Sequence, residues 1–180
     1  MSPAPPHYTS VPEWARAPAV EPADPTGRVH TLIHVGPGSV DEAATGRVVA
    51  AWLEELADRE VLHHRCVAAA DAVAALEGDL ADARIGHRLL VAGSAEVCLA
   101  VRAAAVRAGL SDDEMRFGVV SVERRSVWCV HCSATTSGAI ALEDVVVCTG
   151  CARRLLVYPH VSRRTGQHLG FMVDAEEESA

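Results

Sequence analysis

The chain has 180 residues, a hydrophobic fraction of 49% and 24 acids against 16 basic residues, all of which are arginine. This length allows one ordinary domain with a small second unit and excludes two full-sized enzymatic domains. The formal charge of −8 disfavours nucleic acid and anionic membranes as partners, because phosphate binding requires a basic face.

The sequence carries no targeting pattern. No run approaches the roughly 18 to 20 consecutive apolar residues of a membrane-spanning helix, and the stretch MSPAPPHYTS lacks the basic-then-apolar pattern of a secretory signal. We therefore expect a cytoplasmic protein. In that compartment thiols stay reduced, so paired C-x-x-C motifs indicate metal ligands rather than disulfides.

Residues 1–27 form the first predicted unit, a proline-rich arm. They hold most of the prolines of the chain and show no apolar period, which is typical of an extended or partly disordered segment. Trp14 is the residue that could anchor this arm to the rest of the protein.

Residues 28–124 are predicted to form an α/β domain. The predicted strands are 29–35, 61–66, 88–93 and 117–122, and the predicted helices lie within 41–60, at about 67–83 and at 95–108. Ser94 is the expected N-cap of the third helix, and Gly109 the residue that ends it. Strands that alternate with such helices predict a small Rossmann-like parallel sheet with helices on its faces.

Four residues at predicted strand ends are weak candidates for cofactor binding: Gly36, Gly38, Gly93 and Ser94. Gly36-Pro-Gly38 is only a fragment of a dinucleotide-binding motif, and a plain strand-to-helix turn explains it more simply. The sequence contains no nucleophile elbow, P-loop or complete G-x-G-x-x-G motif, so we expect no catalytic residues on this chain.

The most specific motif is a pair of C-x-x-C turns, Cys129-Val-His-Cys132 and Cys148-Thr-Gly-Cys151. Their spacing predicts four thiolates around one metal ion. The intervening residues are expected to form a turn at 133–139 and a strand at 140–147 that returns the second pair to the first. Residues 125–177 are thus predicted to be a four-cysteine zinc-ribbon or rubredoxin-like β domain, followed by a tail at 178–180.

Zinc and iron both accept four thiolates, and the sequence favours structural zinc. Rubredoxin-type iron sites usually place glycine after each turn, where this chain has Ser133 and Ala152. A closed shell of four sulfurs also leaves no coordination position for a substrate. The two remaining cysteines, Cys66 and Cys98, are expected to be buried small apolar residues.

A polar cluster follows the cysteines. Residues 155–158 predict a strand that pairs with 140–147 and ends at Pro159, and the next side chains include His160, Ser162, Arg163 and Arg164. These groups could bind a carboxylate or phosphate, for instance on a partner protein. The arginines could equally pair with the acids of 174–178 or face solvent, and both interpretations stay open.

Two resemblances add to these predictions. The run from Gly86 to Gly93, with Ser94 and the following helix, resembles the last βαβ unit of the nucleotide-binding lobe in ferredoxin-reductase-like flavoproteins. There the glycine turn lies beside the nicotinamide. Gly118 stands where those enzymes usually have an acid, and Ala92 replaces their cysteine. These departures imply a lobe kept for docking rather than a working NAD(P)H site.

The second resemblance is carried by the two cysteine pairs, the His160-x-Ser162-Arg163-Arg164 segment, Gly170 and Asp174-Ala-Glu176. This pattern resembles the C-terminal domain of the A subunit of dimethylamine monooxygenases, and with the lobe the likeness covers about 28–177. Members of that family work beside a haem-containing oxygenase subunit and a reductase subunit that carries FMN and an iron–sulfur cluster. Together they demethylate secondary methylamines with NADPH and oxygen.

The resemblance implies an accessory subunit of such a complex that assists assembly or electron transfer. Two alternatives stay open. An iron ion in the cysteine site would make the chain a rubredoxin-like electron carrier. The cysteine domain alone would fit a stand-alone zinc-ribbon adaptor.

Overall fold

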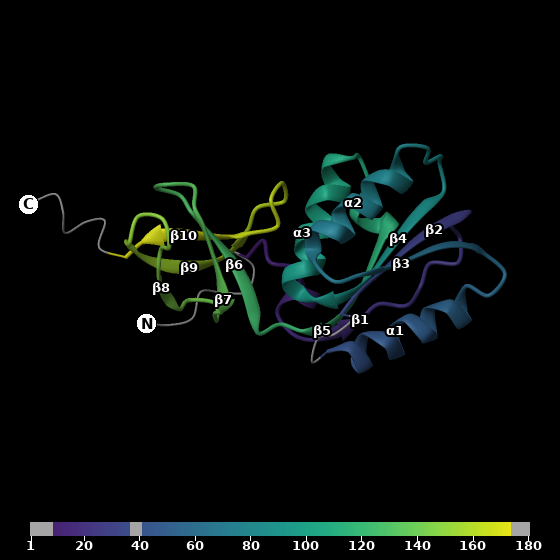
Figure 1. Ribbon diagram of the computed structural model, residues 1–180, viewed down its shortest axis with the longest axis horizontal. Helices are drawn as coiled ribbons and strands as arrows, with labels where there is room; N and C mark the ends of the chain where they lie inside the picture. Colours follow the sequence, from purple (N-terminus) through teal and green to yellow (C-terminus); the bar gives the residue numbers. More distant parts are fainter. Residues whose placement is uncertain (1–8, 37–40, 174–180) are drawn as a thin grey trace, which may run out of the picture.

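The protein consists of two five-stranded sheets that lie side by side (Figure 1), in a computed structural model that describes residues 9–36 and 41–173. The first sheet contains β1 (Ala19–Val20), β2 (Val29–Val35), β3 (Glu60–Cys66), β4 (His87–Ser94) and β5 (Met115–Ser121). The second contains β6 (Arg124–Cys129), β7 (Thr135–Ala139), β8 (Val145–Val147), β9 (Arg154–Val161) and β10 (His168–Met172). A mixed α/β chain is confirmed, while the Rossmann-like and zinc-ribbon assignments stay predictions.

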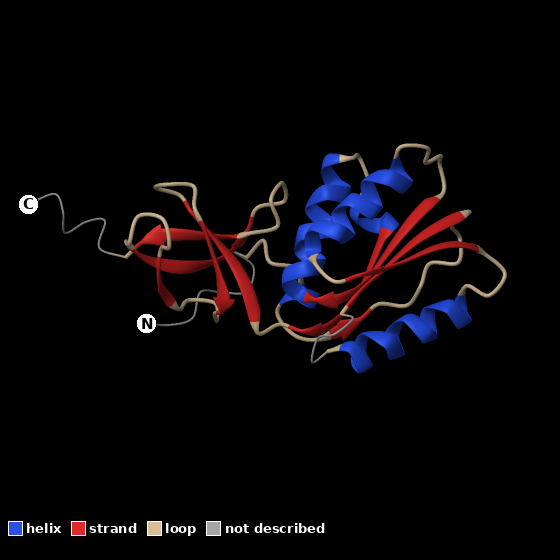
Figure 2. Cartoon of the chain, viewed as in Figure 1, coloured by secondary structure: helices blue, strands red, loops and turns tan. Residues whose placement is uncertain are grey.

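The first sheet has the strand order β1-β5-β4-β2-β3, with β2 to β5 parallel and β1 antiparallel to β5. Figure 2 shows α1 (Glu42–Glu55) on one face and α2 (Ala69–Leu80) and α3 (Ala95–Arg107) on the other. Leu32 and Leu90 pack toward α1, whereas Ile33 and Val91 pack toward α2 and α3. None of the described helices combines the length and apolarity that a membrane span requires.

Local capping explains where α3 begins and ends. The hydroxyl of Ser94 accepts a hydrogen bond from the amide of Val97 (3.5 Å), which confirms the predicted N-cap. After the helix, Gly109 adopts φ +100°, a conformation that side chains rarely take. A capping box follows, since the Glu114 carboxylate accepts hydrogen bonds from the amide and hydroxyl of Ser111.

The described part of the proline-rich arm, residues 9–27, packs against the first sheet. It forms a 3-10 turn and then β1, which pairs with the edge strand β5. Trp14 stacks on Phe117 with ring centroids 4.3 Å apart, and the Glu21 carboxylate accepts a hydrogen bond from the Phe117 amide (2.7 Å). This part of the arm therefore completes the sheet instead of standing apart from it.

The second sheet has the order β7-β6-β10-β9-β8, with only the β6–β10 pair parallel. The expected turn at 133–139 was wrong over 135–139, which form β7, because their polar and β-branched residues pair with β6 in register. The expected strand at 140–147 is a strand only at β8. Before it, Glu143 adopts φ 67° and the Asp144 carboxylate caps the Ala141 amide (2.7 Å), which makes a turn.

Pro159 does not end its strand as expected, because β9 continues to Val161. The register of β9 against β10 shifts between the pairs His168–Val161 and Gly170–Val157, so the proline lies opposite an irregularity. A residue without an amide proton is tolerated at such a point. Its carbonyl instead accepts a hydrogen bond from the Thr9 hydroxyl (2.6 Å).

Candidate metal centre

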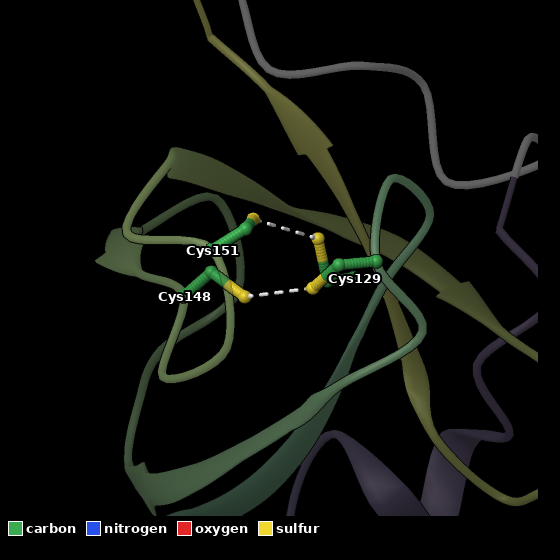
Figure 3. A group of neighbouring side chains, drawn as sticks. Cys129, Cys148 and Cys151 are labelled. Atoms are coloured by element: carbon green, nitrogen blue, oxygen red, sulfur yellow. Dashed lines mark hydrogen bonds between the residues drawn. The ribbon is translucent and has the colours of Figure 1, made fainter.

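Both C-x-x-C turns lie at the far end of the second sheet. Cys129 is the last residue of β6, and Cys132 lies in the turn that leads to β7. Cys148 directly follows β8, and Cys151 precedes β9. Because β10 pairs with both β6 and β9, and β8 pairs with β9, the sheet brings the two turns face to face (Figure 3).

The four sulfurs form one compact group. The Sγ atoms of Cys129 and Cys151 lie 3.8 Å apart, those of Cys132 and Cys148 lie 3.5 Å apart, and all four lie within 4.8 Å of one another. For sulfurs arranged tetrahedrally at about 2.3 Å from an ion, neighbouring sulfurs would be about 3.8 Å apart. The cluster thus has the donor set and spacing to hold one metal ion.

The two turns are built in the same way. The amide of Ser133 donates to the Cys129 carbonyl (2.9 Å), and the amide of Ala152 donates to the Cys148 carbonyl (3.0 Å). Each first cysteine then donates its own amide to the carbonyl five residues later, at Ala134 (2.9 Å) or Arg153 (2.8 Å). These paired hydrogen bonds close each turn independently of any ion, so each presents its two thiols together.

The residue after each turn has a left-handed backbone. Ser133 has φ 63° and Ala152 has φ 59°, where glycine is the usual occupant. Such a conformation costs an L-residue roughly 1 kcal/mol. Both turns therefore keep the backbone geometry that glycine usually adopts, although serine and alanine occupy these positions. The identity of the two residues does not indicate this conformation.

Gly150 is a site residue that sequence reasoning did not single out. A Cβ atom there would lie 3.1 Å from the Cys132 sulfur and 2.5 Å from the Ala134 side chain. Its amide lies 3.4 Å from the Cys148 sulfur and donates to it. The missing side chain allows the second turn to approach the first, a need that only the three-dimensional contact between the turns reveals.

The thiols differ in acidity. Backbone amides, first that of Cys151 and then that of Gly150, lower the pKa of Cys148 to about 6. The Ala134 amide acts to lower the pKa of Cys132, but desolvation of the sulfur and contacts with the other three sulfurs outweigh it and raise this pKa to about 12. One thiolate therefore forms more readily than the next, and a bound cation would favour further negative charges at this spacing.

The surroundings of the cluster are apolar on one side and open on the other. Cys129 and Cys148 are buried with Leu155, whereas Cys132 and Cys151 are more exposed. His131, inside the first turn, is exposed and its Nδ1 lies 2.9 Å from a guanidinium nitrogen of Arg153. This histidine therefore lies at the surface and contacts Arg153.

The polar cluster of 160–164 lies at the junction of the two sheets and not beside the cysteines. Arg163 forms an ion pair with Asp112 (2.9 Å), the guanidinium of Arg107 donates to the Arg164 carbonyl, and the Ser162 hydroxyl accepts from the Thr165 amide (3.3 Å). His160 is half-buried beside the ring of Tyr158. The proposed anion or partner binding by these residues stays a prediction.

The junction is closely packed at one glycine. Gly166 has φ +71°, and a Cβ atom there would overlap the backbone of Leu99 in α3. About one turn before Leu99 in α3, the carboxylate of Glu96 accepts a hydrogen bond from the Ser126 hydroxyl (2.6 Å). The loop that precedes β10 is therefore held directly against the first unit, by which we mean the first sheet with helices α1 to α3; the second unit is the second sheet with the cysteine turns.

Three of the four cofactor-binding candidates lie at one edge of the first sheet. Gly36 follows β2, and Gly93 and Ser94 end β4, so all three lie at the carboxyl ends of adjacent parallel strands. Gly38 lies outside the described residues. Open α/β sheets bind ligands at such an edge, and nucleotide binding here stays a prediction.

Gly118, where the flavoproteins usually have an acid, is required for packing in this chain. A side chain at this position of β5 would overlap Val48 and Trp52 of α1. The indole nitrogen of Trp52 donates to the Glu21 carbonyl (2.9 Å), which fixes the ring over the strand. An acid at position 118 is therefore incompatible with the position of α1.

The two remaining cysteines are buried in the first unit, as predicted. Cys66 ends β3, and Cys98 lies in α3 with its sulfur 3.7 Å from the Val91 carbonyl. Burial raises the pKa of both thiols. They are separate from the cluster of four and serve as small core residues.

Comparisons with known proteins agree with this organisation. Residues 126–171 match the family described as dimethylamine monooxygenase subunit DmmA-like, C-terminal domain. The heme-dependent oxidative N-demethylase delta subunit of Ectopseudomonas mendocina (strain ymp) is 32% identical over 157 residues, which cover 85% of this chain and 84% of that protein. No solved structure matches the chain. The chain therefore belongs to the dimethylamine monooxygenase subunit DmmA-like family.

Proposed function

We propose that this chain is an accessory subunit of a multicomponent, haem-dependent amine monooxygenase that demethylates dimethylamine with NADPH and oxygen. The observation that carries the proposal is the 32% identity, along most of both chains, to a delta subunit of a heme-dependent oxidative N-demethylase. Its expected partners are a haem-containing oxygenase subunit and a reductase subunit with FMN and an iron–sulfur cluster. The chain assists their assembly or the transfer of electrons between them.

The geometry of the cysteine cluster supports an accessory role. The thiolates of Cys129, Cys132, Cys148 and Cys151 would hold one zinc ion, which supplies a cross-link between the two turns when bound. Four protein sulfurs complete a tetrahedral shell, so a substrate would find no open position. The chemistry of the complex would then take place on the partner subunits.

Iron in the same site is the second candidate, and one observation favours it. Cys132 lies at the surface, so an ion in the cluster would be close to a docked partner. Iron would supply a one-electron carrier, and the chain would then transfer electrons as rubredoxin does. Against this, the positions after the two turns are Ser133 and Ala152, as the sequence already indicated.

A reconstitution experiment tests the proposal. The haem-containing and reductase subunits, each purified alone, are assayed for NADPH-dependent demethylation of dimethylamine with and without this chain. We expect the chain to co-elute with at least one of them and to raise turnover. A chain that binds neither subunit and leaves turnover unchanged would contradict the proposed function.

Two additions to the assay distinguish the roles. If the chain only assists assembly, zinc-loaded protein supports full turnover, and a spectrum recorded during turnover shows no reduction of this chain. If it carries electrons, only iron-loaded protein is active, and its visible absorption bleaches when NADPH is added to the complete mixture.

A further inference from the structure

A chain of hydrogen bonds joins three strands of the first sheet to the end of α2. The hydroxyl of Thr31 in β2 donates to the Oδ2 atom of Asp79 in the last turn of α2 (2.6 Å). The same Oδ2 atom accepts a hydrogen bond from Nε2 of His64 in β3 (2.8 Å). Nε2 of His87, the first residue of β4, lies 2.9 Å from the Thr31 hydroxyl oxygen. Asp79 and His87 are thereby fixed on either side of one buried hydroxyl.

These hydrogen bonds determine which atoms of the two groups stay available. The Thr31 hydroxyl donates its one proton to Asp79, so it accepts from His87, and the ring proton of His87 lies on Nε2. Burial lowers the pKa of His87, which keeps the ring neutral near neutral pH and leaves Nδ1 as an acceptor. Among the described residues, neither Nδ1 of His87 nor Oδ1 of Asp79 has a hydrogen-bond partner, and neither atom is sealed from solvent. The pair therefore offers two acceptors to a ligand.

Asp79 and His87 both line a pocket of about 280 Å³. His87 is 7% exposed and the Asp79 side chain 14%, so the two residues lie at the base of the pocket rather than at its rim. The apolar part of the wall is formed by Val29, Leu62, Ala83 and Ile85. Ile85 is 97% exposed, so a bound alkyl group would shield it from water. An apolar wall above two acceptors fits a small ligand that carries both alkyl groups and N–H donors.

The base of the pocket favours a cation over an anion. An anion would meet the Asp79 carboxylate and the lone pair of His87 Nδ1, and both would repel it. A cation with N–H donors would satisfy both atoms. The rim adds little to this choice, because charged side chains of both signs line the pocket. They are Glu60, Asp82, Arg28 and Arg84, and the Arg84 guanidinium donates to two backbone carbonyls of its own loop (3.3 Å each).

We propose that this pocket binds a small organic ammonium ion through Asp79 and His87. Oδ1 of Asp79 accepts one N–H and forms the ion pair, Nδ1 of His87 accepts a second N–H, and the alkyl groups lie against the apolar wall. A protonated secondary amine carries two N–H donors and two alkyl groups, so it matches this arrangement. The inference rests on the proposed function only for the choice of dimethylammonium as the first ligand to test.

A metal ion fits this pocket less well than an ammonium ion. Metal sites built from side chains need three or more ligand atoms close together. Within the described ranges, the four cysteines are the one group of histidine, cysteine and acidic side chains that meets this condition. Asp79 and His87 therefore suit a ligand that brings its own N–H donors, not a bare ion.

The position of the pocket favours a small solute over another segment of the chain. The pocket lies at the amino ends of β2, β3 and β4, while the carboxyl end of the parallel strand β5 leads into β6 and the second unit (Figure 1). Thr9 bonds to Pro159 of β9, and Val173 directly follows β10, so the first and last described residues both lie at the second unit. Gly36 lies at the opposite end of β2. The pocket is thus far from each point where the described chain ends.

The test titrates the full-length chain with dimethylammonium chloride and follows backbone amide chemical shifts, with sodium chloride at equal ionic strength as the reference. A ligand with so few atoms binds weakly, so we expect saturable shifts with a dissociation constant of about 1 mM or weaker. The shifts should centre on Asp79 and residues 83–87. Trimethylammonium, with one N–H, should bind about tenfold more weakly, and tetramethylammonium, with none, should not bind measurably.

Two variants carry the test to the proposed residues. Asp79→Asn keeps the shape of the side chain and an oxygen for Thr31 and His64, but it removes the charge. We expect it to weaken dimethylammonium binding at least tenfold, because the ion pair is lost. Asp58→Asn makes the same change at an exposed residue outside the pocket and should bind as wild type does. Amide spectra without ligand report whether each variant is folded, and the ligand series on wild type depends on neither variant.

Absent or non-saturating shifts, equal binding of tetramethylammonium, or wild-type affinity in a folded Asp79→Asn would overturn the ammonium site. This outcome is separate from that of the proposed function. A chain that binds no amine but raises turnover in the reconstituted mixture would remove this site alone. A chain that binds the amine in the pocket but neither subunit would keep the site and contradict the proposed function.

Discussion

The two units of this chain reach stability by different means. In the first, helices cover both faces of the sheet, and two apolar clusters of described residues fill the space between them, one of eight buried residues and one of nineteen, of which Val161 belongs to β9. In the second, the two apolar clusters contain three buried residues each, and two of those six are cysteines of the metal cluster. The small unit lacks the core that the large one has.

This difference shows why the two units need different supports. A sheet with so little buried apolar surface requires a cross-link, and four thiols at metal-binding distances can supply one. The first unit has a larger apolar core of its own and contacts the second through Asp112, Glu96 and the backbone of α3.

The largest expected effect follows loss of one thiol. Cys129→Ser should release the metal and cost the second unit on the order of several kcal/mol, because metal-binding energy is folding energy in such units. Hydrogen exchange should then accelerate in β6, β9 and β10 while β2 and β4 stay protected. Cys66→Ser is the matched control and should retain the metal. Unchanged exchange in Cys129→Ser would show that the second sheet does not depend on the ion.

A substitution in the first unit removes the indole ring of Trp52, which holds α1 to the first sheet. Trp52 is 1% exposed and packs over Gly118, so Trp52→Ala should leave a cavity and cost about 3 to 5 kcal/mol. Metal content should stay the same, because the cluster lies in the other unit. Leu53→Ala, at the exposed neighbour, should barely change the denaturant midpoint. Metal loss in the Trp52 variant would mean that the units are not separable.

Acid should weaken the second unit through His168. Burial first, and then the nearby Arg125 charge, lower the pKa of this histidine from 6.5 to about 4. The His168 ring therefore binds a proton more tightly in the unfolded chain than in the folded one. The stability that neutral His168 contributes is complete above about pH 6.5 and is lost as the pH falls toward 4. The full loss in the free energy of unfolding is roughly 3 kcal/mol.

Urea titrations of the second unit between pH 7 and 4 measure this dependence. His168→Gln should flatten the slope, whereas His131→Gln, at an exposed histidine, should leave it as in wild type. An identical slope in wild type and His168→Gln would assign the acid sensitivity to another group, such as the metal-binding thiolates.

A methyl group between the two cysteine turns should change the metal affinity alone. Gly150→Ala places a carbon close to the Cys132 sulfur and the Ala134 side chain, which forces the turns apart. We expect metal affinity to fall about tenfold, or ~1.4 kcal/mol. Competition with a chromophoric chelator measures the metal affinity of each form. Gly138→Ala, which meets nothing closer than 3.8 Å, is the control. Equal affinities would show that the turns can separate without cost.

The smallest effect is a stabilisation. Ala152→Gly relieves a left-handed alanine and should raise the free energy of unfolding of the second unit by up to about 1 kcal/mol. Ala141→Gly, at an exposed alanine without a positive φ, should lower it slightly instead. Thermal melts of the two variants beside wild type provide the comparison. A loss of stability in both would show that the turn is not strained.

The sequence predicted the features that depend on local pattern. Ser94 and Gly109 gave the limits of α3, and the run of apolar residues gave each strand of the parallel sheet. The two C-x-x-C motifs indicated that four thiols would meet. In each instance the contacts that determine the feature lie within a few residues, or the spacing of the cysteines itself indicates metal binding.

The features that it did not predict depend on distant partners. Thr135 and Thr136 belong to a strand only because β6 lies beside them, and the polar run alone indicates a turn. Arg163 pairs with Asp112, which is 51 residues earlier, so no local pattern reports that contact. The left-handed backbone at Ser133 could not be predicted for a different reason. Glycine is the residue that would have indicated this conformation, and the sequence has serine there.

The metal content of the purified protein shows most directly whether an ion bound by Cys129, Cys132, Cys148 and Cys151 supports the second unit. Native mass spectrometry and a visible spectrum are recorded on wild type and Cys129→Ser, each purified without added metal. We expect one zinc per wild-type chain, no colour, and no zinc in the variant. A folded, metal-free wild type would contradict the claim, and one iron with visible absorption would make the chain an electron carrier.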